Sequence, residues 1–137
     1  MTCTCCTQPL ADAQRVDYPA SLFGAVDFPF RVEPTIFNFA GQLSADYTGG
    51  MWDFYALSNG GFYMAPKTDK PFDVRAENGF EGRLSACAFG MTVCLYAFSH
   101  LSFDADGLAE TCTEQYHLLR AHVLEQREAQ AMLAAID

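Results

Sequence analysis

Asn59 and Gly60, near the middle of the chain, constrain the fold more strongly than any other pair of residues. Asn-Gly between two apolar runs is typical of a β-hairpin with a type I′ turn, because that turn needs positive φ at both central residues. The sequence therefore predicts one strand over 51–57 and a returning strand over 62–65. Pro66 ends the pairing, since proline has no backbone N–H to donate.

The two-residue loop predicts the register of this hairpin. In that register Leu57 lies opposite Phe62, and Tyr55 lies opposite Met64. Both faces of the hairpin are then largely apolar. Such a hairpin needs cover on both faces in the centre of a sheet, or it carries a functional aromatic patch on one face.

A second hairpin is predicted after a polar loop at 67–70. Residues 72–76 alternate between apolar and charged side chains, which is typical of a half-exposed strand. A three-residue loop ending at Gly79 sets opposite charges across from each other on one face, and these pairs fix the register. The predicted pairs are Arg75 with Glu81 and Asp73 with Arg83.

Helices are predicted on both sides of these four strands. Pro34 suits the first turn of a helix that ends before Gly49. Ser85 can cap a helix over 86–101 that is apolar nearly all round and therefore belongs in the core. Helical spacing resumes over 108–123 and over 129–136, with a break near Glu125.

The N-terminal third is interrupted by prolines. A short helix is possible over 10–23, although Pro19 disfavours its continuation, and Pro29 favours extended structure or an edge strand over 24–33. The predicted fold class is α+β, with a mainly antiparallel four-stranded meander sheet and helices before and after it packed on the sheet. The chain is predicted to be a single domain over 1–137, with a flexible tail at 1–9.

The charge of the chain argues against ordinary nucleic-acid binding. Seventeen acidic and eight basic residues give a formal net charge of −9, whereas binding to a phosphate backbone requires a basic patch. The acidic residues are scattered, and their surplus is modest beside one charge per roughly 1.7 Å of DNA. We therefore interpret the charge as solubilising, in preference to DNA mimicry.

No catalytic motif is present. The sequence lacks a P-loop, a G-x-S-x-G elbow, an H-E-x-x-H motif and a dinucleotide-binding fingerprint. Cys3, Cys5 and Cys6 form a C-x-C-C cluster that lacks the paired spacing of a zinc site. A metal- or redox-sensing module built on these cysteines is the alternative hypothesis for function. We predict no catalytic residues, no metal site and no cofactor.

The central block carries a resemblance to a known family. Residues 44–55, SADYTGGMWDFY, and residues 57–66, LSNGGFYMAP, are similar to the signature of the ArdB/KlcA antirestriction family. The similarity extends from about Leu22 to Asp137, and the N-terminal cysteines lie outside it. The resemblance implies an inhibitor of host type I restriction-modification enzymes that protects the incoming DNA of plasmids or mobile elements. It also implies that the chain is not an enzyme.

The resemblance further implies a protein partner, the restriction-modification enzyme, and no direct specific binding to DNA. The first residues lack the pattern of a signal peptide and no run is long enough to span a membrane, so a cytoplasmic protein is expected. No oligomeric state is predicted.

Five residues are predicted to contact the partner. Acidic and aromatic groups together suit a protein surface that normally holds DNA. These predicted contacts are Asp46, Tyr47, Trp52, Asp53 and Asp137. Tyr47 and Trp52 would suit a structural role equally well. We expect Trp52→Ala or Asp137→Asn to lower protection of plasmid DNA without unfolding the protein.

Overall fold

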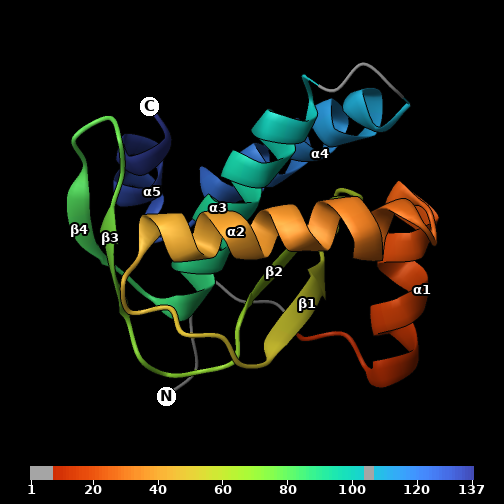
Figure 1. The fold of residues 1–137 in the computed structure, drawn as a ribbon, viewed down its shortest axis with the longest axis horizontal. Coiled ribbons are helices and arrows are strands. Elements are labelled where there is room, and N and C mark those ends of the chain that lie inside the picture. The colour runs from red at the N-terminus through yellow and green to blue at the C-terminus, as the bar shows by residue number, and fades with distance from the viewer. Residues whose placement is uncertain (1–7, 104–106) are drawn as a thin grey trace.

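The computed structural model describes residues 8–103 and 107–137, and the cysteine cluster at 3–6 lies outside these ranges. Helices and strands follow in the order shown in Figure 1, where α3 occupies the centre and α2 lies across it. Their bounds are α1 (Asp12–Phe23), the π-helix η1 (Phe28–Val32), α2 (Glu33–Leu43), β1 (Trp52–Ala56), β2 (Phe62–Pro66), β3 (Phe72–Arg75), β4 (Glu81–Leu84), α3 (Ala86–Leu101), α4 (Leu108–Val123) and α5 (Ala129–Ile136). The α+β class is confirmed.

The four strands form two separate hairpins, so the prediction of one four-stranded meander sheet is wrong. β1 pairs with β2 and β3 pairs with β4, both antiparallel, and the described residues form no ladder between the two hairpins. Helix α3 packs against β2 and contacts both β3 and β4. The apolar faces that suggested a central position in one sheet are therefore covered largely by helices.

The register of the first hairpin differs by one residue from the prediction. Tyr55 pairs with Tyr63, and their rings stack with centroids 4.6 Å apart. The loop has three residues, because the N–H of Leu57 donates to the carbonyl of Gly61 at 2.9 Å. Only Gly60 has positive φ in this loop, whereas a type I′ turn would require it at Asn59 as well. The second hairpin has the predicted register and its predicted three-residue loop.

Both hairpin loops are fastened to a C-terminal helix by an asparagine. In the first, the Asn59 carboxamide accepts from the Gly61 N–H and donates to the Leu118 carbonyl in α4, each at 2.9 Å. In the second, Asn78 accepts from the Phe80 N–H at 2.9 Å and donates to the Ala134 carbonyl in α5 at 3.0 Å. Each asparagine thus shapes its own loop and also links it to a distant element.

Helix α3 is the core of the molecule. Thirteen of its 16 residues are buried, and the Ser85 hydroxyl caps it by accepting from the Ala88 N–H, as predicted. Gly90 allows the helix to approach β2 closely, because a Cβ at this position would lie 2.4 Å from the Ala65 Cβ. None of the helices in the described ranges is both long and apolar enough to cross a membrane.

The N-terminal third is helical where extended structure was expected. Helix α1 continues through Pro19, whose ring is buried, and Pro29 lies in the first turn of η1. A proline in a first helical turn costs little, because its missing N–H would have no partner inside the helix. The Glu33 N–H donates to the Phe28 carbonyl five residues earlier, which is the spacing of a π-helix.

The buried thiol of Cys94 leads to a prediction about alkaline stability. Burial raises the pKa of Cys94 from its usual 9.0 to about 12. Because the folded protein holds this proton more tightly than the unfolded chain, its stabilising contribution is complete below pH 9 and is lost as the pH rises toward 12. We expect the free energy of unfolding, measured by urea denaturation, to fall over this interval. The fall should be shallower in Cys94→Ala, and equal slopes in the two proteins would contradict the assignment.

Candidate functional site

One hollow lies between α2 and the β3–β4 hairpin, and its lining includes Ala45, which directly precedes the predicted contact Asp46 in the chain. This α2/β3–β4 groove has a volume of ≈ 750 Å³ and is lined on one side by residues 41–43 and Ala45, and on the other by both strands. Figure 1 shows the C-terminal end of α2 beside β3, with α5 next to the upper part of the hairpin. The groove is therefore bounded by a helix terminus and by a short two-stranded sheet.

Four alternating charges form the polar face of the hairpin that lines this groove. The Arg83 Nε lies 3.0 Å from the Asp73 Oδ1, and the Arg75 Nε lies 3.7 Å from the Glu81 Oε2. Both predicted cross-strand pairs are confirmed. The hydrogen bond and charge of Asp73 raise the pKa of the Arg83 guanidinium, and the charge of Asp46 acts in the same direction.

Asp46 connects the loop after α2 to the edge of β3. Its Oδ2 accepts from the Asp73 N–H at 2.9 Å, and its own N–H donates to the Ser44 hydroxyl at 3.2 Å. In the observed register the Asp73 N–H points away from β4, so it would otherwise be an unpaired edge donor. Asp46 is exposed, and its carboxylate both closes this edge and adds negative charge beside the groove.

Tyr47 and Trp52 form an aromatic pair next to Asp46. The Trp52 Nε1 donates to the Tyr47 hydroxyl at 3.2 Å, and the two rings meet edge to face at 5.7 Å. Trp52 is only 3% exposed and also packs against Phe37. Tyr47 is half-buried. The structure thus places Trp52 beneath the surface, where it supports the position of Tyr47.

The two remaining predicted contacts lie in different environments. Asp53 is half-buried on β1, opposite Ala65. Asp137 is exposed and follows α5, and its N–H donates to the Leu133 carbonyl at 3.0 Å. Asp46, Tyr47 and Trp52 therefore form one group, whereas Asp137 lies at the end of the helix that holds the tip of the β3–β4 hairpin.

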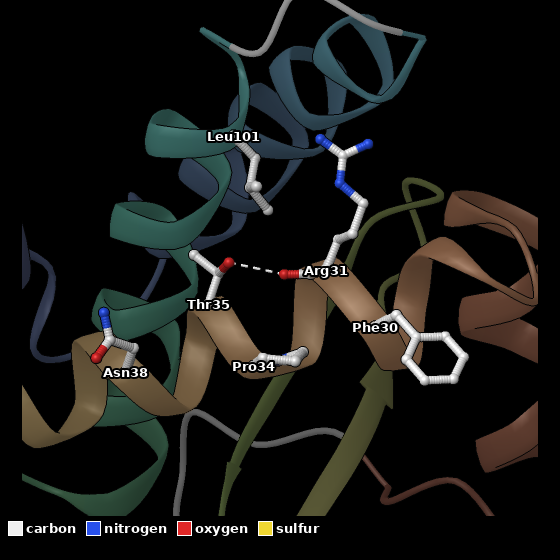
Figure 2. Close-up of a pocket in the computed structure, with 6 residues that line it drawn as sticks. All are labelled: Phe30, Arg31, Pro34, Thr35, Asn38 and Leu101. Carbon is white, nitrogen blue, oxygen red and sulfur yellow. Dashed lines mark hydrogen bonds between the residues drawn. The ribbon is translucent and has the colours of Figure 1, made fainter.

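A second hollow lies beside η1 and is drawn in Figure 2. The Thr35 hydroxyl donates to the Arg31 carbonyl at 2.7 Å, and the Arg31 side chain points toward the side where Leu101 lies. The Phe30 ring points away from these residues and is 76% exposed. None of the five predicted contact residues lines this hollow.

Sequence reasoning missed the contribution of α2 to the groove. Gly41 and Gln42 are exposed in its last turn, which carries no basic residue. That absence was visible in the sequence, but only the structure places this helix end opposite the charged hairpin. Within residues 8–103 and 107–137, no three His, Cys, Asp or Glu side chains are grouped so that they could hold a metal ion.

The fold and this groove define a small acidic α+β protein with a groove lined by charged side chains beside the end of α2. The family profile described as antirestriction protein matches residues 32–137, which is most of the chain. The chain therefore belongs to the antirestriction protein family.

Individual relatives agree with this assignment. The chain is 40% identical to the antirestriction protein KlcA of Escherichia coli, over 93% of this chain and 90% of that protein. It is 37% identical to the uncharacterized protein YafX of Escherichia coli K12, over 94% of this chain and 86% of YafX.

A solved structure matches with a TM-score of 0.86 and 37% identity, covering 95% of this chain and 93% of the other. It comes from work describing a novel fold for KlcA and ArdB, and antirestriction activity against type I DNA restriction systems in vivo but not in vitro.

Proposed function

We propose that this chain inhibits host type I restriction-modification enzymes by direct protein contact, and that it protects the incoming DNA of a plasmid or other mobile element inside the cytoplasm. The observation that carries this proposal is the similarity of nearly the whole chain to KlcA and to the solved KlcA/ArdB structure. The net charge of −9 supports a protein partner over a DNA partner, because phosphate groups would be repelled.

The contact surface we propose consists of the α2/β3–β4 groove together with Asp46 and Tyr47 beside it. Asp46 is exposed and charged, yet its position is fixed by its bond to the β3 edge. A fixed charge loses little conformational entropy when a partner binds. Asp53 and Asp137 are further proposed contacts, and Trp52 is proposed to act by holding Tyr47 in place.

The function is tested by transforming unmodified plasmid DNA into isogenic hosts with and without a type I system, each expressing the chain. Expression should raise transformation efficiency in the restricting host and leave the other host unchanged. An unchanged ratio between the hosts would overturn the proposal. The assay is done in cells because the activity described for KlcA and ArdB was found in vivo but not in vitro.

Asp46→Asn should reduce this protection by about tenfold, which corresponds to ~1.4 kcal/mol of binding free energy. Asparagine keeps an oxygen that can accept from the Asp73 N–H, so the variant removes the charge and preserves the fold. Asp17→Asn, at an exposed position on α1, makes the same change in net charge away from the groove and should protect like the unmodified chain. Asp137→Asn belongs in the same series, with circular dichroism as the folding control.

If Asp46→Asn and Asp17→Asn both protect as well as the unmodified chain, Asp46 is not part of the contact. If both reduce protection equally, total charge rather than this surface determines the inhibition.

A further inference from the structure

We propose that strand β4 is a self-complementary edge through which two copies of this chain pair. The pairing joins the two β3–β4 hairpins into one antiparallel four-stranded sheet, in which the two β4 strands are neighbours at the centre. Three observations support it: the outer edge of β4 is open, its charges complement those of a second copy, and its middle residue is a glycine. The proposal does not depend on the inhibition proposed above.

The outer edges of the other three strands are closed by specific contacts. On β1 the Phe54 carbonyl accepts from the Leu10 N–H at 2.8 Å. On β2 the Met64 N–H donates to the Cys94 Sγ at 3.5 Å. On β3 the Asp46 carboxylate accepts from the edge N–H, as described above. Because an open strand edge invites pairing with another chain, proteins usually cover it, and β4 is the exception in this fold.

The outer edge of β4 offers backbone donors and acceptors that have no partner. In the observed register, the backbone groups of Glu81 and Arg83 point away from β3. Within residues 8–103 and 107–137, no hydrogen bond reaches these backbone groups, and both side chains are exposed. Further along, the Ser85 N–H already donates to the Glu128 carboxylate at 3.0 Å, so the open edge ends there. Figure 1 shows β4 on the outer side of its hairpin, with β3 between it and α2.

An antiparallel pair of β4 strands centred on Gly82 matches the charges of the two copies. In this register Glu81 lies opposite Arg83 of the second copy, and by symmetry Arg83 lies opposite Glu81. Both residues have outward backbone groups, so each such pair exchanges two backbone hydrogen bonds. Arg75 and Asp73 already face these residues within each hairpin. The polar face of the joined sheet therefore carries two rows of four charges that alternate in sign.

Gly82 lies where the two backbones of the pair approach most closely. Opposed residues in a non-hydrogen-bonded antiparallel pair have Cα atoms about 4.5 Å apart. Gly82 adds no side chain to this space, and the Phe80 ring lies over it, since an added Cβ would be 2.8 Å from the Phe80 Cζ. On this face Phe80 lies opposite Leu84 of the second copy. Apolar residues thus meet apolar residues on one face, and opposite charges meet on the other.

Association should be weak and reversible, because the pair is small. A stable interface buries about 800 Å² on each partner, and five strand residues bury less, so we expect a Kd on the order of 0.1 mM. Sedimentation equilibrium over roughly 0.01–1 mM protein should show a mass that rises from that of one chain toward twice that value. A mass that stays at one chain over the whole range would overturn the proposal.

Charge reversal tests the register of the pair. Glu81→Arg puts an arginine opposite Arg83 of the second copy, and Arg83→Glu puts a glutamate opposite Glu81. Each variant alone should therefore dimerise at least about tenfold more weakly than the unmodified chain. An equal mixture of the two variants restores both opposite-charge pairs and should associate like the unmodified chain. A mixture that remains monomeric, although both variants are folded by circular dichroism, would contradict this register.

Glu114→Arg is the matched control. It makes the same change in charge as Glu81→Arg, at an exposed position on α4. It should dimerise at least as well as the unmodified chain, because it lowers the net negative charge that each copy carries. Equal weakening by Glu114→Arg and Glu81→Arg would overturn the assignment of the pairing to β4.

Amide hydrogen exchange gives a readout on the unmodified chain. The N–H groups of Glu81 and Arg83 should exchange more slowly at high protein concentration, because they become paired only in the dimer. The Gly82 N–H faces β3 in the observed register, so its exchange should not depend on concentration. If dimers form while the exchange of Glu81 and Arg83 stays constant, the copies pair through another surface and the proposal fails.

Discussion

Gly90→Ala is expected to lower the free energy of unfolding by about 2–3 kcal/mol, even though alanine favours a helix more than glycine does. An added Cβ would lie 2.4 Å from the Met64 carbonyl oxygen and 2.5 Å from the Ala65 Cα. These are backbone atoms of β2, which cannot move aside as a flexible side chain can. Helix α3 and β2 would have to separate, and the buried residues around them would lose contact. Urea denaturation of the purified variant measures the effect.

Gly41→Ala is the matched control for this prediction. Gly41 also lies within a helix, α2, but a Cβ there would meet no atom within 4 Å. The variant should therefore gain about 0.5–1 kcal/mol from helix propensity alone. If both glycine variants change stability in the same direction, the close approach of α3 to β2 does not explain the role of Gly90.

Trp52→Ala is expected to destabilise the protein by about 3–5 kcal/mol. The side chain is 3% exposed, packs edge to face against Phe37 at 5.4 Å, and donates its indole N–H to the Tyr47 hydroxyl. Because domains of this size have only about 5–15 kcal/mol of stability in total, such a variant should show a clearly lower thermal midpoint by circular dichroism. This expectation differs from the one based on sequence, in which Trp52→Ala left the fold intact.

Tyr47→Phe can separate a binding role from a loss of stability, which Trp52→Ala cannot do. It removes only the hydroxyl that accepts from the indole, so its cost should be near 1 kcal/mol. Loss of protection in Tyr47→Phe with a nearly unchanged melting temperature would assign a binding role to the tyrosine. A Trp52→Ala variant that melts like the unmodified chain would contradict the buried placement.

The sequence was sufficient to predict the pairing register of the second hairpin and insufficient to predict that of the first. The difference has an identifiable physical reason. In the second hairpin, charges alternate with apolar residues, so only one register pairs Asp73 with Arg83. In the first, both faces are apolar, and a slip of one residue leaves the pattern almost unchanged. The dipeptide Asn59-Gly60 then suggested a type I′ turn, whereas the structure uses a three-residue loop in which the asparagine side chain accepts from the Gly61 N–H.

Assembly of the strands and the location of the groove could not be predicted from local patterns. The uniformly apolar helix over 86–101 indicated a core helix, and α3 is one. The sequence could not show that this helix packs on β2 while the strands form two separate sheets. Asp46 was selected for its charge and its place beside aromatic residues. Its bond to the Asp73 N–H joins segments 27 residues apart, and no periodic pattern reports such a contact.

The asparagine contact between the β3–β4 hairpin and α5 has a consequence for the proposed binding of a partner. Asp46 holds one end of this hairpin, and the Asn78 carboxamide joins the other end to the Ala134 carbonyl. A partner that binds the hairpin only in this position also favours the docked state of α5, and docking of α5 favours binding by the same free energy. Under the proposed function, loosening of α5 from the hairpin tip would therefore weaken binding of a partner at the groove.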